Sequence, residues 1–239
     1  MTYCVAMRVK AGMVFLADSR TNAGVDHIAT FRKMHIFQQA DERVLVLMSA
    51  GNLATTQSVV SLLRQRSHSD MPNMLNCLSL YEGAEILGTT IREVIQRDGG
   101  QSQSAVDFGC SFILGGQIRG EDMRLFHVYS EGNFIEATED TQYFQIGELK
   151  YGKPIIDRAI DYRSTLEQAT KCALISMDST IRSNLSVGLP LDLLRYTADS
   201  LDASHHFDIT EQHPGFKSLR ESWARGLKRT FNRLPDFEW

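Results

Sequence analysis

Short hydrophobic segments dominate the first fifth of the chain and predict paired strands. The segments 3–8 and 13–17 are separated by a glycine-containing turn, as in a β-hairpin, and 36–38 and 44–49 form a second pair. Positions 44–48 are apolar without interruption, which predicts a strand that is covered on both faces.

Helical periodicity follows, and the two patterns then alternate. Asn52 is a suitable N-cap for a helix with apolar residues every three to four positions, and a second such helix stops at 98–100. Four strand-like segments, at 108–116, 123–129, 134–137 and 143–146, precede helical patterns around 155–160 and 166–180. Two further strand-like segments follow, at 191–196 and 206–209, and an amphipathic helical pattern at 216–231 comes last.

This order of strands, two helices, strands and two helices predicts an α/β (α+β) fold in which two sheets pack face to face beneath outer helices. The chain has 239 residues, which suits one large domain or two small ones. We find no repeat and no linker. A single domain therefore follows, with a core over about residues 2–200 and a C-terminal extension over about 201–239.

Composition excludes several classes of protein. The net charge is −4, with 25 basic and 29 acidic residues, which argues against nucleic acid as a partner. No apolar run approaches the ~18 residues that span a membrane, and the N-terminus does not resemble a signal peptide. The four cysteines lack metal-ligand spacing, so we expect reduced core thiols, a cytoplasmic location, no metal and no cofactor.

The N-terminus carries the most informative chemistry. Removal of Met1 before the small Thr2 would leave a hydroxyl and a free α-amine on one residue. An α-amine has a pKa of about 7.7–8.0, so it can accept the hydroxyl proton near neutral pH. A threonine at this position is also common in proteins without such chemistry.

Three further residues strengthen the interpretation of Thr2 as a nucleophile. Asp18 ends the second predicted strand, where antiparallel pairing would place it beside the start of the first. Lys33 precedes the next strand, and a buried lysine would favour the ionised hydroxyl. Gly51 lies at a strand-to-helix junction, where its N–H suits an oxyanion. Taken singly, each residue has a simpler structural interpretation: Asp18 as a turn residue, Lys33 as a solvated charge and Gly51 as a tight corner.

Together these residues resemble the proteasome beta-type subunits, which are N-terminal nucleophile hydrolases. The matching features are Thr2, the Asp18-Ser19-Arg20 motif, Lys33 and the Ser49-Ala50-Gly51 motif before a helix. Three longer strings, at 1–5, 18–26 and 183–188, resemble the bacterial ancestral beta-subunit (Anbu) branch of that family. The resemblance covers about residues 2–200, and the tail is also similar to that branch.

The resemblance implies a four-layer αββα sandwich with a C-terminal strand and helix extension. It implies that Thr2 is the nucleophile, that Lys33 tunes its hydroxyl, that Asp18 orients Lys33 and that the Gly51 N–H stabilises the oxyanion. It also implies that substrate lies along Thr21, Ser49 and Ala50. The reaction would be amide hydrolysis through an ester on Thr2, in a homo-oligomeric ring or open-ring helical particle.

Two positions depart from the family pattern near the N-terminal amine. Glu148 stands where the family has a serine between two glycines. Ser183 and Ser186 occupy the places of an aspartate and a serine, and Asn184 adjoins them. With Ser19, these residues are candidates for supporting the site. The departures keep open an assembly module without turnover and an amidase acting on a small amide, and no ATPase partner is evident.

Other candidate residues rank lower. Cys4 lies on the same side of its strand as Thr2, but we expect it in the core. The pair at 205–206 lacks acidic or cysteine partners at ligand spacing, and the glycines at 115–116 lack a nucleotide-binding continuation. The last helix has a basic face, expected to be solvated or to contact an acidic neighbour, formed by Arg220, Arg225, Lys228, Arg229 and Arg233.

Overall fold

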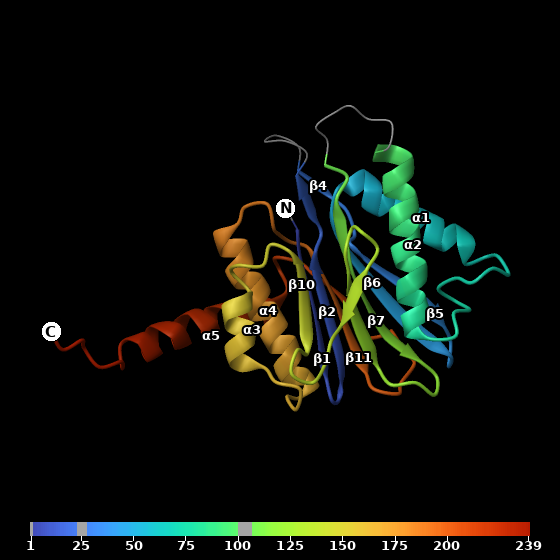
Figure 1. The fold of residues 1–239 in the computed structure, drawn as a ribbon. Coiled ribbons are helices and arrows are strands. Elements are labelled where there is room, and N and C mark those ends of the chain that lie inside the picture. The colour runs from blue at the N-terminus through green and yellow to red at the C-terminus, as the bar shows by residue number, and fades with distance from the viewer. Residues whose placement is uncertain (1, 23–27, 100–106) are drawn as a thin grey trace.

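The computed structural model describes residues 2–22, 28–99 and 107–239, and places them in four layers (Figure 1). Two antiparallel sheets lie face to face, and helices cover both outer faces, as the pattern predicted. Within these residues no helix is both long and apolar enough to cross a membrane.

The first sheet combines the two ends of the chain. Its strands, in spatial order, are β10 (Tyr143–Gly147), β1 (Tyr3–Val9), β2 (Gly12–Asp18), β11 (Leu191–Thr197) and β12 (His206–Ile209). Cys4 on β1 lies opposite Ala17 on β2, and Tyr3 lies opposite Gly147 on β10. The residues before Tyr3 and after Ala17 therefore meet at one edge of the sheet.

The second sheet runs in chain order, and a small ribbon accompanies it. The sheet contains β5 (Met34–Gln39), β6 (Arg43–Gly51), β7 (Cys110–Ile118), β8 (Arg124–Val128) and β9 (Phe134–Glu136). The ribbon pairs β3 (Arg20–Asn22) with β4 (Ile28–Thr30). The hydrophobic pattern did not predict the ribbon, because three-residue strands are too short to show a period of two.

Helix pairs cover each sheet, and their caps follow the sequence. α1 (Leu53–Arg66) and α2 (Leu80–Gly99) cover the second sheet, while α3 (Lys153–Ala159) and α4 (Leu166–Ser183) cover the first (Figure 1). The predicted cap is confirmed, since Asn52 Oδ1 accepts the Thr55 N–H at 3.1 Å. Thr165 and Gln168 form a capping box at the start of α4.

Three apolar layers hold the sandwich together. On β6, Val44 and Val46 pack between the sheets, whereas Leu45 and Leu47 face α1 and α2. This alternation explains the uninterrupted apolar run, because both faces of the strand are covered. The strand predicted at 108–116 is observed at Cys110–Ile118. The Gly109 carbonyl, just before this strand, accepts the N–H of Asn52, the N-cap of α1, at 2.9 Å.

The C-terminal helix α5 (Pro214–Phe231) extends away from the body (Figure 1). Phe216 anchors its first turn in the core, and Arg220 is ion-paired with the buried Asp178 at 2.5 Å. The predicted solvated basic face is therefore wrong for Arg220, because Asp178 draws its guanidinium onto α4. Arg225, Lys228 and Arg229 remain exposed on the helix.

Candidate active site

The backbone of Thr2 is held between β10 and the start of β1. Its carbonyl accepts the Glu148 N–H at 2.7 Å. Gly147 has φ +85, and a Cβ there would lie 2.0 Å from the Thr2 carbonyl oxygen. Glycine at 147 is therefore required for Thr2 to lie in this position.

Asp18 and Lys33 form a buried ion pair next to Thr2. Lys33 Nζ lies 2.6 Å from Asp18 Oδ1 and donates to the Arg20 carbonyl at 2.7 Å. Asp18 also accepts the N–H groups of Tyr3 at 3.0 Å and Gly188 at 3.3 Å. Burial raises the pKa of Asp18, whereas Lys33 and the two N–H groups stabilise its charged form.

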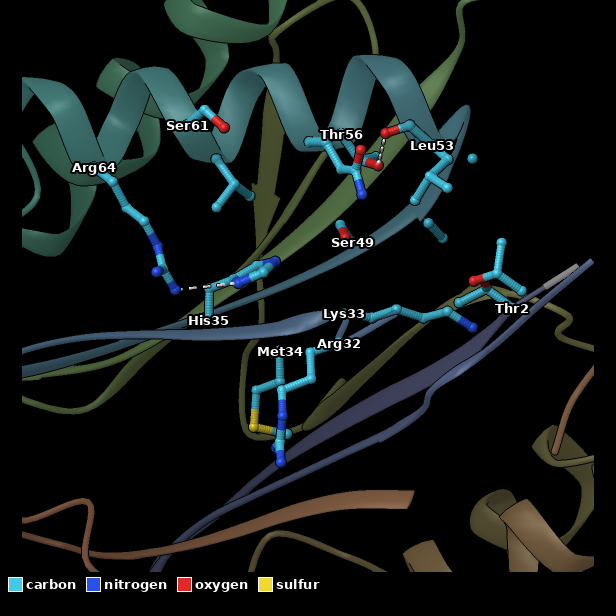
Figure 2. A pocket seen from close by; sticks show the side chains of 15 residues that line it. Thr2, Arg32, Lys33, Met34, His35, Ser49, Leu53, Thr56, Ser61 and Arg64 are labelled. Carbon is cyan, nitrogen blue, oxygen red and sulfur yellow. Dashed lines mark hydrogen bonds between the residues drawn. The ribbon is translucent and has the colours of Figure 1, made fainter. Parts of the chain in front are cut away.

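A pocket of about 470 Å³ collects six of the predicted residues (Figure 2). We call it the Thr2 pocket, and the predicted residues that line it are Thr2, Thr21, Lys33, Ser49, Ala50 and Gly51. The Lys33 side chain reaches along the pocket toward Thr2 (Figure 2). The Thr2 residue, the Lys33 cation and other polar side chains thus share one cavity.

Gly51 turns the chain from β6 into the first helical turn of α1. Its φ is +107, and a Cβ would lie 2.5 Å from the Gly109 carbonyl oxygen, so no other residue fits without strain. The predicted corner is confirmed. At this end of α1 the helix dipole favours negative charge in the pocket.

Thr21 on β3 presents an unusual hydroxyl group. Its Oγ1 is buried yet has no hydrogen-bond partner in the part of the chain that the structure describes. A buried hydroxyl normally finds a partner. A ligand in the Thr2 pocket would supply one.

The four support candidates from the second half of the chain divide into two groups. Glu148 is buried, and its carboxylate accepts the Asn184 amide and the Lys150 N–H, both at 3.0 Å. Asn184 in turn accepts the Ser186 N–H at 3.0 Å. Ser183 is exposed at the end of α4. The structure thus brings Glu148 and Asn184 together and leaves Ser183 at the surface.

Ser19 has a partner away from the Thr2 pocket. Its hydroxyl and its N–H both donate to the Pro190 carbonyl, at 2.6 and 3.1 Å. These bonds tie the end of β2 to the segment before β11. The geometry gives Ser19 a structural role.

Cys4 and the histidine pair also have structural surroundings. Cys4 is completely buried between the sheets, and burial raises the pKa of its thiol, which confirms the expected core position. His206 is hydrogen-bonded to Asp192, which also pairs with Arg32 at 3.3 Å. No cluster of three metal-ligating side chains occurs in the described ranges.

The pocket residues that the sequence analysis missed include three with basic side chains, Arg32, His35 and Arg64. Arg32 spans Asp192 and Asp208, at 3.3 and 2.8 Å. Arg64 comes from the last turn of α1, and one of its nitrogens lies 3.4 Å from His35 Nδ1 on β5. Only the packing of α1 over β5 brings these two together. The sequence offered one indication of His35: residues two apart in a strand lie on the same face, so His35 is expected on the face of Lys33.

Replacing His35 by glutamine is expected to reduce the acid sensitivity of folding. Burial and the nearby Arg64 lower the pKa of His35 from 6.5 to about 4. The unfolded chain therefore binds this proton first, and stability that is complete above pH ~6.5 is lost as the pH falls toward 4. The loss by pH 4.5 is about 2–3 kcal/mol.

Urea unfolding at pH 7.5 and pH 4.5 measures this effect. The fall in unfolding free energy between the two values should be smaller in the His35→Gln variant than in the parent. The half-buried His127, whose pKa is also lowered by burial, is common to both proteins and cancels in the comparison. An equal fall in both would contradict the prediction.

Known proteins resemble this chain over its whole length. A family model described as proteasome subunit matches residues 2–189. The structure of Anbu (ancestral beta-subunit) from Yersinia bercovieri is 59% identical, covers 99% of each chain and has a TM-score of 0.95. A helical assembly of the Anbu complex from Pseudomonas aeruginosa is 51% identical, covers 99% of this chain and 98% of that one, and has a TM-score of 0.95.

A third solved structure agrees with these two. The Anbu (Gly-1) mutant from Hyphomicrobium sp. strain MC1 is 46% identical, covers 100% of both chains and has a TM-score of 0.94. A search of curated proteins returned no match. The resemblance therefore rests on the family model and on solved structures, and it extends through α5.

Proposed function

Because this chain belongs to the Anbu branch of the proteasome subunit family, we propose that it hydrolyses peptide or amide bonds with Thr2 as nucleophile. One observation carries the proposal. Lys33 lines the same cavity as Thr2, and its Nζ lies 2.6 Å from Oδ1 of the buried Asp18. A buried ammonium at a hydroxyl is the arrangement that favours its ionisation.

The proposed reaction begins once Met1 has been removed. The Thr2 α-amine accepts the Oγ1 proton as Oγ1 attacks the substrate carbonyl carbon. Lys33, held charged by Asp18, lowers the energy of the developing negative charge. The Gly51 N–H donates to the carbonyl oxygen as it becomes an oxyanion. The amine proton passes to the leaving nitrogen, the C–N bond breaks, and an ester on Thr2 remains until water hydrolyses it.

Glu148 and Asn184 are proposed to support the free amine. The Glu148 N–H already holds the Thr2 carbonyl at 2.7 Å, and its carboxylate is oriented by Asn184. A carboxylate close to the amine would favour the protonated form that hands its proton to the leaving group. This pair would replace the serine and aspartate that the wider family has near the amine.

Substrate is proposed to lie along Thr21, Ser49 and Ala50. The unpartnered Thr21 hydroxyl and the lining of the Thr2 pocket support this placement. An amidase acting on a small amide would use the same residues. An assembly module would keep the fold but would not need the buried ion pair, so the pair favours the enzymatic alternatives.

Thr2-directed labelling tests the proposal. Intact mass should show loss of Met1, and an electrophile directed at N-terminal threonine should then add one equivalent to the processed, assembled protein. Retention of Met1 would exclude the free-amine mechanism. Processed protein that stays unlabelled would instead favour the assembly module.

We also propose that the chain assembles with copies of itself into a ring or open-ring helical particle. The similar Pseudomonas aeruginosa structure is described as a helical assembly. Here α5 leaves the body with large apolar side chains exposed, among them Leu227 and Phe231. Exposed apolar surface of this kind marks an interaction site.

The four cysteines are buried thiols, which suits a reducing, cytoplasmic location.

Reversing the charge of Arg225, Lys228 and Arg229 together is expected to weaken assembly. These side chains are exposed in the protomer, and an acidic surface on a neighbour would gain from them. Light scattering should show smaller particles at equal concentration. Arg220→Glu is not a suitable control, because Arg220 pairs with Asp178 within the chain. Particles of unchanged size would contradict the prediction.

A further inference from the structure

The end of the Thr2 pocket away from Thr2 carries positive charge. Figure 2 shows Thr2 and the Lys33 ammonium near one end, and Arg64 with His35 near the other. The cavity also takes in Arg32, and among the described residues that line it none is an aspartate or glutamate. A ligand in the cavity therefore meets cationic side chains and no opposing carboxylate on the wall.

Two of the three cations are already neutralised by the protein. Lys33 is paired with Asp18 at 2.6 Å, and Arg32 spans Asp192 and Asp208. Arg64 has no carboxylate within 4 Å among the residues that the structure describes, and its one hydrogen-bond contact there is His35 Nδ1 at 3.4 Å. The positive charge available to a ligand is thus that of Arg64.

His35 orients this guanidinium without adding charge. Since a guanidinium only donates, His35 Nδ1 must be the acceptor, and the pKa of His35 near 4 keeps the ring neutral at pH 7. The remaining guanidinium N–H groups point to no protein acceptor that the structure describes. A planar fork of this kind matches a carboxylate.

The length of the cavity indicates how long a peptide could span it. Its lining on α1 runs from Leu53 to Arg64, which is about 16 Å at 1.5 Å per residue. An extended peptide covers that distance with about four to five residues. The charged end thus lies several residues from the bond at Thr2, so a peptide reaches it with a side chain remote from that bond.

We propose that Arg64, oriented by His35, binds a carboxylate of the substrate that is remote from the scissile bond, so that the substrate class is acidic peptides or acidic amides. The proposal rests on the proposed function for the identity of the scissile bond. Arg64 is a specificity residue here, because it contacts a remote part of the substrate and takes no part in the bond that breaks. The specificity comes from ionic contact at the far end of the pocket.

Binding to a Thr2→Ala protein tests the proposal without turnover. Peptides of about five residues that differ only by glutamate or glutamine are compared by calorimetry, with the assembled protein. We expect the glutamate peptides to bind about 10-fold more tightly at low salt, and the difference to shrink at high salt. Arg64→Gln should abolish the difference, and Arg64→Glu should make lysine peptides the better ligands.

Arg66→Gln is the matched control, because Arg66 lies on the same helix but is bonded to Glu93 and Thr90 on α2. It should keep the glutamate preference. Equal binding of glutamate and glutamine peptides, or a preference that survives Arg64→Gln, would overturn the proposal. Labelling of Thr2 in the processed parent protein separates the two proposals. If the parent stays unlabelled but the Thr2→Ala protein prefers glutamate peptides, the hydrolase proposal alone is overturned. If the parent is labelled but the Thr2→Ala protein shows no preference, the Arg64 proposal alone is overturned.

Discussion

Thr2→Ala is expected to lower the turnover of a peptide or amide substrate by about 10³-fold or more, because it removes the oxygen that forms the ester. Folding should be almost unchanged. The contact that holds Thr2 is the bond from the Glu148 N–H to its backbone carbonyl, at 2.7 Å, and alanine keeps that carbonyl. Thermal unfolding and particle size should therefore match the parent.

Thr2→Ser is the matched variant for this prediction. It retains the hydroxyl and loses only a methyl group, so it should keep measurable turnover and electrophile labelling. The comparison uses initial rates on protein whose Met1 removal has been verified by mass. Turnover by Thr2→Ala at the parent's rate would show that another group carries the reaction.

Lys33→Met is expected to affect both catalysis and stability. It leaves the Asp18 carboxylate buried without its cation, which costs about 3–5 kcal/mol in unfolding free energy. Turnover should fall by about 10²-fold or more, since one preorganised charge is lost beside Thr2. If only turnover falls, Lys33 serves catalysis alone, and if only the unfolding free energy falls, Lys33 serves stability alone.

The pH dependence of this variant follows from the carboxyl group. Burial already raises the pKa of Asp18, and removal of Lys33 raises it further. A carboxyl whose pKa is raised in the native state stabilises the fold at low pH and loses that contribution as the pH rises through its native pKa. The Lys33→Met protein should therefore recover stability in acid, which denaturant unfolding from pH 4 to pH 8 would measure.

The double variant Lys33→Met/Asp18→Asn separates stability from catalysis. The side-chain amide that replaces the Asp18 carboxylate is uncharged. Its oxygen can still accept a hydrogen bond from the N–H of Tyr3 or of Gly188, both of which donate to Asp18 in the parent. Most of the unfolding free energy should return while turnover stays low. Turnover that returns with stability would show that Lys33 acts only through folding.

Strand and helix positions were predictable where burial imposes a period. The apolar run at 44–48, the cap at Asn52 and the stripe along α4 each matched the structure, because each side chain's neighbours are set by local geometry. The ribbon of β3 and β4 was missed, since its pairing depends on the surrounding sheets. Arg220 was misjudged because Asp178 lies on another helix.

The sequence by itself indicated which residues gather at the Thr2 end of the pocket. Thr2 and Asp18 stand at the ends of the adjacent strands β1 and β2, and antiparallel pairing brings these ends together whatever the loops do. Lys33 precedes β5 in the second sheet, so its ion pair with Asp18 depends on how the two sheets face each other. The far end of the pocket was decided only by tertiary structure. Arg64 and His35 meet because α1 crosses β5, and no local period encodes the angle at which a helix packs on a sheet.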